Sequence, residues 1–594
     1  MKTIESKKNK LQKSSQSFAV GALIMAAGMI VVKIAGAAFK VPLAYILGGV
    51  GTGYFNNAYS IYNPIYALAT AGLPIAISRM VAGDMARKRY KDVRAIHKVS
   101  VPLFLGTGLV GCVLMIIGSF FYVRFTNSPG SLYSMFMLAP TVFFSCMISI
   151  YKGYFEGLRN MIPTAVSEIV EAVSKVFFGL GFAWLASEHG MREYYAYGTV
   201  YGKAFENASA ARNATLPFAS AGAVLGITLG SVMGFLYIFI KYKVSGDGIT
   251  EQELLESKEP RPKKKLIKML LDIAVPIALG SIIMNLGSTV DSILVQRRLY
   301  DVMKNVPYAL LNEYNGFIPE QVVKENKTHI FLAGCFGYMN TVTMLLYTIT
   351  QGLGISALPS VTSAWVEGVK SKIKKSIETT LKITSMIALP AGLGMSVLSF
   401  PIMDLLYNTL GKNKQMGEIC VSAKIMSIYA IGVIFVAIST PICSMLQAIG
   451  RADLPLKILT IGIIIKIVLN YMLVGIPEVN IQGAGIGTIV CYLFVCTSGL
   501  ALLQKHSGVH FNLNKIFLKP AVCALICAAA AYSSHGVFAY LINYKLATII
   551  AIFFAAIVYG ASLLLTGAIS SEDLCSISKL KKVSDVLKKH NLIK

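Results

Sequence analysis

Apolar runs of about 20 residues or more recur along the whole chain, and no other feature limits its fold as strongly. A helix of about 20 residues spans a hydrocarbon core of about 30 Å. Of the 594 residues, 55% are hydrophobic and 14% are charged. A soluble domain needs far more polar surface than this, so the apolar excess must face lipid. The sequence therefore predicts an all-α integral membrane protein.

The apolar runs predict fourteen transmembrane helices. The first six cover about 18–45, 54–78, 99–124, 132–156, 163–187 and 218–241. The next six cover about 270–297, 328–359, 377–400, 418–447, 455–476 and 484–504. The last two cover about 518–541 and 546–568. The first run follows a basic segment, as in a signal peptide, but it contains Lys33 and many spans follow. We therefore expect it to be retained as the first transmembrane helix.

The net charge of +26 is distributed as a topology signal. Lys and Arg fall in short segments between the apolar runs, and alternate segments collect about three dozen of them, against roughly a dozen on the other side. The positive-inside rule then places both termini in the cytoplasm. An odd number of spans would scramble this bias, so the pattern supports fourteen helices. It also argues against nucleic acid as a partner.

Weak internal matches indicate that the chain contains two similar halves. Both halves begin on the cytoplasmic side, so the repeat is parallel, related by an axis along the membrane normal. Transporters built this way bind substrate at the repeat interface and alternate access by rocking two bundles. The matches are Gly36 with Gly287, which places Lys40 opposite Asp291; Thr70-x-Gly72-Leu73 with Thr350-x-Gly352-Leu353; and a Gly, Arg159 and Pro163 with Gly450, Arg451 and Pro455.

This organisation predicts two pseudo-symmetric six-helix bundles with two C-terminal helices appended. The linker between the bundles is charged and is broken by Pro260 and Pro262, so we expect a flexible connector. The predicted segments are a basic cytoplasmic N-terminus (1–17), the first bundle (18–242), the linker (243–268), the second bundle (269–505), the last two helices (518–568) and a basic cytoplasmic tail (569–594).

Two lysines in the first predicted helix are candidates for a substrate cavity. An ionisable side chain at membrane depth costs about 3 kcal/mol or more, so such residues are usually buried, paired and functional. Lys33 lies near the middle of the helix, too deep to reach the surface comfortably, and we expect it to face a cavity. Lys40 lies nearer the outside, where it either lines the cavity or snorkels outward.

The helix over 163–187 carries a charged stripe. Glu168, Glu171 and Lys175 are spaced i, i+3 and i+7, which puts all three on one helix face. Glu171 and Lys175 can pair across one turn. The stripe is either a structural ion pair between helices or a cavity wall with a releasable cation.

Four further charged residues are cavity candidates. Asp291 and Lys466 are single charges at membrane depth, and Asp291 has the alternative role of neutralising a lysine across the bundle interface. Arg297 and Arg298 lie at the outer end of a helix, where they serve either as interfacial anchors or as part of the exit.

The sequence contains no pattern typical of catalysis. The ten cysteines are scattered without metal-ligand spacing, and no D-x-D, Gly-rich phosphate loop or H-E-x-x-H motif is present. We expect a transporter rather than an enzyme, with no catalytic residue, no metal site and no cofactor apart from a possible coupling ion. Fixed lysines suit a phosphate-bearing substrate, whereas an exporter of cationic drugs needs a buried carboxylate. An inside-negative potential would favour outward movement of an anion by about 2.3 kcal/mol per charge per 100 mV.

Five segments of the chain resemble the multidrug/oligosaccharidyl-lipid/polysaccharide (MOP) flippase superfamily. They are Val31–Gly48, Asn63–Arg89, Tyr151–Lys175, Asp272–Leu299 and Gln447–Pro455. The third is the most specific, because its PTAVS–E–VE pattern is typical of the polysaccharide-biosynthesis branch. That branch includes the stage V sporulation protein B-like and Gram-positive lipid II flippases. The resemblance covers about residues 15–570.

The resemblance implies a two-lobed fold of fourteen helices in the bacterial plasma membrane. It implies that the chain flips an undecaprenyl-pyrophosphate-linked cell-wall precursor from the inner to the outer leaflet, with lipid II as the favoured cargo. The last two helices would form a groove for the lipid tail. Lys33 falls where the family has a basic pyrophosphate contact, and Glu171 and Lys175 match an acid and a base of the branch. Phe39 and Lys40 replace the Arg-Asp pair of the Gram-negative lipid II flippases, so the ion-coupling scheme of those proteins does not transfer.

Two other functions compatible with this fold are a polysaccharide repeat-unit flippase and an ion-coupled multidrug exporter. The expected partners are the anionic undecaprenyl-linked lipid, the bilayer and cell-wall synthesis proteins, and we expect a monomer. The first predicted helix and the number of spans argue against the multidrug exporter.

Overall fold

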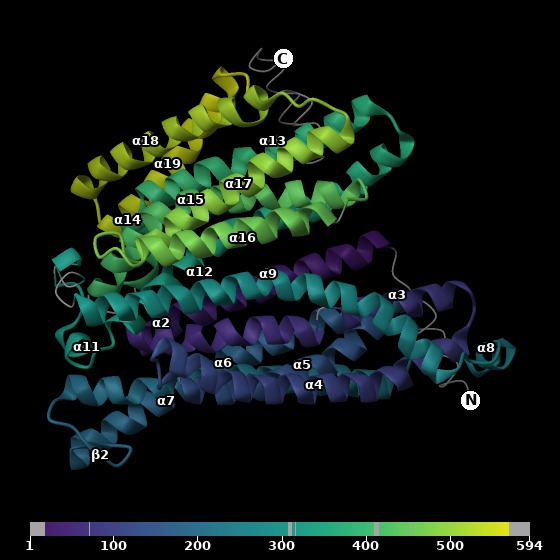
Figure 1. Ribbon diagram of the computed structural model, residues 1–594, viewed down its shortest axis with the longest axis horizontal. Helices are drawn as coiled ribbons and strands as arrows, with labels where there is room; N and C mark the ends of the chain where they lie inside the picture. The colour runs from purple at the N-terminus through teal and green to yellow at the C-terminus, as the bar shows by residue number, and fades with distance from the viewer. Residues whose placement is uncertain are drawn as a thin grey trace. The chain divides into compact units, whose positions relative to one another are not determined.

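The computed structural model describes residues 18–568 except 71, 307–309, 311, 315, 409–414 and 452 (Figure 1). Helices account for almost all of these residues, as the apolar runs predict. In the N-terminal part they are α2 (Phe18–Thr70), α3 (Leu73–Ala86), α4 (Tyr90–Thr126), α5 (Ser131–Gly157), α6 (Ile162–Tyr197), α7 (Ala208–Ser245), α8 (Glu251–Glu256) and α9 (Lys263–Asn305). They continue as α11 (Glu320–Lys324), α12 (Thr328–Glu367), α13 (Lys370–Val397), α14 (Ser399–Tyr407), α15 (Met416–Ala448), α16 (Asp453–Leu473), α17 (Gln482–Ser507), η1 (Asn514–Leu518), α18 (Lys519–Leu541) and α19 (Tyr544–Leu565). Strands β1 (Thr199–Val200) and β2 (Lys203–Ala204) form a short antiparallel hairpin between α6 and α7.

Twelve stretches in the described part of the chain are long and apolar enough to cross a membrane. This confirms an all-α, multi-pass membrane protein. The stretch Ala27–Ala86 contains the two predicted helices over 18–45 and 54–78, and α9 covers the predicted helix over 270–297 without being among the twelve. The number of fourteen spans and the cytoplasmic placement of the termini stay predictions, and segments 1–17 and 569–594 lie outside the described residues.

The long helix α2 folds back on itself at Gly48. The backbone of Gly48 has φ 61° and ψ −170°, a region that is essentially restricted to glycine. Phe39 and Phe55, on either side of this break, have ring centroids 6.1 Å apart. Sixteen residues of straight helix would separate them by about 24 Å. α2 is therefore a helical hairpin, with one limb for each of the two predicted helices.

The chain packs into two compact units. The first runs to Tyr300 and includes Glu320–Gly334, and the second comprises Asp301–Pro319 and the chain from Cys335 onward. In the first unit α6 and α7 pack together most extensively, and α5 packs against both α4 and α7. In the second unit α15 packs against α13 and α17, and α18 packs against both α13 and α19 (Figure 1). The division into units places α9 as far as Tyr300 in the first unit.

The linker between the predicted bundles packs against the first unit, unlike the flexible connector expected from its composition. Its helix α8 begins with a capping box, in which the Thr250 hydroxyl accepts from the Glu253 amide (3.3 Å) and the Glu253 carboxylate accepts from the Thr250 amide (2.8 Å). Reciprocal bonds of this kind satisfy two backbone donors that the helix itself leaves free.

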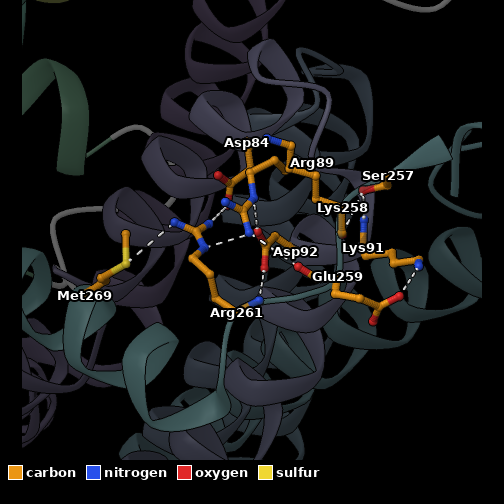
Figure 2. Close-up of polar contacts among 9 residues, drawn as sticks. All are labelled: Asp84, Arg89, Lys91, Asp92, Ser257, Lys258, Glu259, Arg261 and Met269. Atoms are coloured by element: carbon orange, nitrogen blue, oxygen red, sulfur yellow. Dashed lines mark hydrogen bonds and ion pairs between the residues drawn. The ribbon is translucent and has the colours of Figure 1, made fainter.

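Beyond α8, Arg261 inserts between two buried carboxylates (Figure 2). Its backbone amide donates to Asp92 Oδ1 (2.7 Å), its Nε donates to Asp92 Oδ2 (3.1 Å), and its Nη2 pairs with Asp84 Oδ2. The side chains of Asp84 and Asp92 are 4% and 0% exposed, and that of Arg261 is 12% exposed. Arg89 also pairs with Asp92. These contacts hold Arg261 of the linker against α3 and α4, because buried carboxylates are stabilised by a cationic partner.

We predict that Arg261→Gln lowers the free energy of unfolding by about 3 kcal/mol, because it leaves Asp84 without its guanidinium partner. Thermal unfolding of the detergent-solubilised protein measures this change. Lys91→Gln is the matched control, since the partner of Lys91, Glu259, is 85% exposed, and an exposed pair contributes about 1 kcal/mol or less. Equal melting temperatures for the two variants would contradict a structural role for Arg261.

Candidate functional site

The first limb of α2 and helix α6 run side by side in the same direction. An ideal Cβ built on Gly28 would lie 3.2 Å from Ala165 Cβ, and Phe39 packs against Gly179. The eleven-residue step from Gly28 to Phe39 therefore runs alongside the fourteen-residue step from Ala165 to Gly179. This register places Lys33 at about the height of Glu171.

Three predicted site lysines gather on these two helices. Lys175 Nζ lies 5.1 Å from the centroid of the Phe39 ring, a cation–π contact. Lys40 follows Phe39 in the chain and lies within electrostatic range of both Lys175 and Lys33. The Lys33 side chain is exposed. We call Lys33, Lys40 and Lys175 the lysine group.

The carboxylates of the predicted stripe take partners on neighbouring helices. Lys152 of α5 donates to Glu168 Oε1 at 3.1 Å, an ion pair between helices. Glu156, one turn further along α5, lies within electrostatic range of both members of that pair. Sequence reasoning considered an interhelical ion pair for the stripe but missed Lys152, because which helix packs beside α6 is decided by the tertiary fold.

The predicted pairing of Glu171 with Lys175 is wrong. Glu171 Oε1 accepts a hydrogen bond from Ser231 of α7 at 3.1 Å, whereas Lys175 faces the Phe39 ring. The reason is the close approach of α7 at Gly230, where an ideal Cβ would lie 2.8 Å from the Glu171 carbonyl oxygen. With so little space between the helices, Ser231 reaches the carboxylate.

Aromatic rings connect the lysine group to the carboxylates. Phe39, Phe55, Tyr59, Tyr62 and Tyr66 form a continuous series with successive ring centroids 6.1, 5.0, 5.8 and 5.2 Å apart. The last four lie on the second limb of α2 at helical spacing, a pattern that is visible in the sequence. We call these five residues the aromatic ladder.

The ladder ends beside the charged residues of α5 and α6. Tyr62 and Tyr66 lie within electrostatic range of Glu171, and Tyr66 also lies within range of Lys152. Phenol hydroxyls both donate and accept hydrogen bonds. The first unit therefore holds a polar strip with Lys40 and Lys175 at one end, an acid–base pair at the other, and Lys33 between them at about the height of Glu171.

Four predicted site residues remain, namely Arg297, Arg298, Lys466 and Asp291. Arg297 donates to the Phe125 carbonyl oxygen (3.4 Å) and lies over the rings of Phe125 and Tyr300, and Arg298 beside it is half-buried. Lys466 is half-buried on α16 in the second unit. The side chain of Asp291 lies outside the described residues.

Two family descriptions match the chain. "Polysaccharide biosynthesis protein" matches residues 18–205 and "Lipid II flippase MurJ" matches residues 335–560. The chain is 21% identical to the lipid II flippase MurJ of Bacillus subtilis, over 86% of each chain. It is 23% identical to stage V sporulation protein B of the same organism, over 88% of this chain and 91% of the relative.

Two solved structures share the fold. An inward-facing multidrug resistance MATE family transporter of the MOP superfamily aligns with a TM-score of 0.57 and 15% identity, over 80% of this chain and 99% of that chain. The lipid II flippase MurJ in an inward closed conformation aligns with a TM-score of 0.51 and 14% identity, over 87% of this chain and 98% of that chain. These likenesses agree with the predicted all-α membrane fold.

We predict that Gly226→Ala disturbs the strip by separating α6 from α7. A Cβ at Gly226 would clash with the backbone of Gly179, which cannot move away as a flexible side chain could. Overpacking of this kind costs about 1–3 kcal/mol, measurable by thermal unfolding. Gly181→Ala on α6 is the matched control, because its Cβ meets nothing within 4 Å. Equal melting temperatures for the two variants would show that the contact at Gly226 does not hold α6 against α7.

Proposed function

Because this chain belongs to the MOP superfamily of flippases and transporters, we propose that it flips an undecaprenyl-pyrophosphate-linked cell-wall precursor. The precursor moves from the inner to the outer leaflet of the bacterial plasma membrane, with both termini of the chain in the cytoplasm. The function is transport rather than catalysis. Lipid II is the favoured cargo, since the family description matched by residues 335–560 and the relative from Bacillus subtilis are both lipid II flippases.

The lysine group is the observation that carries this proposal. The group places three ammonium groups on two adjacent helices. Lys40 lies within electrostatic range of both Lys33 and Lys175, and Lys175 contacts the Phe39 ring next to Lys40. Like charges repel, and an anion bound beside these ammonium groups would relieve that repulsion. A pyrophosphate provides several acceptor oxygens and charge-assisted hydrogen bonds for lysine. A cationic drug would meet repulsion at the same place, which disfavours the multidrug exporter.

A polysaccharide repeat-unit flippase is the second candidate. The family description matched by residues 18–205 is that of polysaccharide biosynthesis proteins, and those residues contain the whole lysine group. Both cargoes have the same pyrophosphate lipid and differ in the sugar. The lysine group would serve either of them, so the choice between them rests on the head group beyond the phosphates.

The pair of Lys152 and Glu168, with Glu171 and Glu156 nearby, is our candidate for ion coupling. Three carboxylates outnumber the lysine that they surround, so one of them can accept a cation. The membrane potential is a second drive, worth about 2.3 kcal/mol per charge per 100 mV for an anionic head group moving outward.

We predict that Lys33→Ala and Lys175→Gln each lower the initial flipping rate at least tenfold in vesicles that contain undecaprenyl-pyrophosphate-linked sugar. Each removes one ammonium group from the lysine group, and tenfold corresponds to about 1.4 kcal/mol. Lys203→Gln on the exposed β2 strand is the control and should leave the rate unchanged. In cells depleted of their resident lipid II flippase, the wild-type chain should restore growth and the two site variants should not.

Three results would contradict the proposal. A well-expressed wild-type chain that does not restore growth would exclude lipid II as the cargo. Transport of a cationic dye in preference to the pyrophosphate lipid would favour the multidrug exporter. Wild-type flipping rates for Lys33→Ala and Lys175→Gln would remove the lysine group from the mechanism.

A further inference from the structure

The turns that precede α6 and α16 have the same hydrogen-bond pattern. In the first turn the amides of residues 158, 159 and 160 donate to the carbonyls of 154, 156 and 155, and in the second those of 449, 450 and 451 donate to 445, 447 and 446. The middle residue has a left-handed backbone in both, with φ 58° at Arg159 and 83° at Gly450. The two turns coincide under a shift of 291 residues, from 159 to 450. The alignment of Arg159 with Arg451 expected from sequence is therefore wrong by one residue.

This shift places Lys466 at the position of Lys175. It also places Asn470 at the position of Gly179. The contacts of these two positions with the next helix of each unit support the same shift. Gly226 of α7 packs against Gly179, and Gly487 of α17 packs against Asn470. The hairpin of α16 and α17 therefore repeats that of α6 and α7, with a lysine at the same place in each.

The neighbouring glycines show the same correspondence in sequence. The segment GAVLG ends at Gly226, and the segment GAGIG ends at Gly487. The helix contacts thus give this register, and the turns, whose hydrogen-bond pattern also follows α3 at 87–89, agree with it. The equivalence of Lys175 and Lys466 does not depend on how the two units are placed.

Lys466 lies against α17 within the second unit, since an ideal Cβ on Gly487 would lie 3.7 Å from Lys466 Cγ. Tyr492, further along α17, is within electrostatic range of Lys466, and also of Tyr429 from α15 and Tyr347 from α12. All four side chains are half-buried. Phenol hydroxyls can donate to an oxyanion that a lysine neutralises. Lys175 in the first unit likewise lies near aromatic side chains, those of the aromatic ladder.

Lys466 lies well inside its helix, as the fourteenth residue of the 21-residue α16. Charged side chains at membrane depth are usually functional. The equivalent lysine in the first unit belongs to the lysine group. A lysine at the same position in both units points to a shared task.

We propose that Lys466, with the hydroxyl of Tyr492, forms a second anion site, which binds a phosphate group of the substrate. This inference rests on the proposed function for the identity of the substrate, but not for the existence of the site. Lys466 is then the second unit's equivalent of Lys175. The ligand class is an oxyanion of phosphate or pyrophosphate.

The test uses inorganic pyrophosphate as the probe and the purified full-length protein in detergent. Isothermal titration calorimetry should show that Lys466→Gln weakens binding of pyrophosphate at least fivefold and that Lys466→Arg largely restores it. Lys457→Gln is the matched control on the same helix, since Lys457 is 69% exposed and pairs with Asp453, and it should bind as the wild type does.

Tyr492→Phe keeps the packing and removes one hydroxyl, so it tests the site even if Lys466→Gln does not fold. We expect pyrophosphate affinity to fall two- to fivefold. Wild-type affinity in both Lys466→Gln and Tyr492→Phe would overturn the proposal, as would absence of pyrophosphate binding to the wild-type protein at millimolar concentration.

The vesicle assay separates this inference from the proposed function. If the wild-type chain does not flip the pyrophosphate lipid but binds pyrophosphate through Lys466, the proposed function fails and the anion site stands. If the wild-type chain flips the lipid and Lys466→Gln flips and binds as well as the wild type, the anion site fails and the function stands.

Discussion

The backbone contact between α6 and α7 is the interaction on which the rest of the strip depends. Glycines at this contact remove the side chains that would hold the helices apart. Because the helices touch, Ser231 reaches Glu171, and Lys175 is left to face Phe39. Phe39 itself packs on Gly179, so the same contact fixes the limb of α2 that carries Lys33 and Lys40. One packing feature thereby positions the lysine group and its nearest acid.

Hydropathy alone predicted most of the fold. Each apolar run overlaps a described helix, because a span without water must satisfy its backbone internally. The helices often extend beyond the runs, as α6 does to Tyr197, since polar residues continue a helix once it leaves the hydrocarbon. The break at Gly48 agrees with the gap between the first two predicted helices. The position of each charged residue along its helix could therefore be predicted.

The residues that pair with these charges from neighbouring helices could not be predicted. Helical periodicity placed Glu168, Glu171 and Lys175 on one face, but it contains no information on what packs against that face. Lys152 and Ser231 come from other helices and were missed for that reason. The one-residue error in the repeat has a similar origin, since Arg159 takes a left-handed backbone that its residue type does not suggest. The linker was misjudged because its charges were read as solvated, whereas Arg261 is held between buried carboxylates.

The break in α2 has a consequence for the direction of every later segment. Any other residue at position 48 would strongly disfavour the backbone conformation that Gly48 adopts. Without that break, the surrounding sequence would form one continuous helix. The chain would then cross the bilayer once where the sequence predicts two crossings. Each following helix would enter from the opposite face, and the basic loops would lose the cytoplasmic side that the sequence predicts for them. The parity of the whole topology is thus set by the conformation of a single glycine.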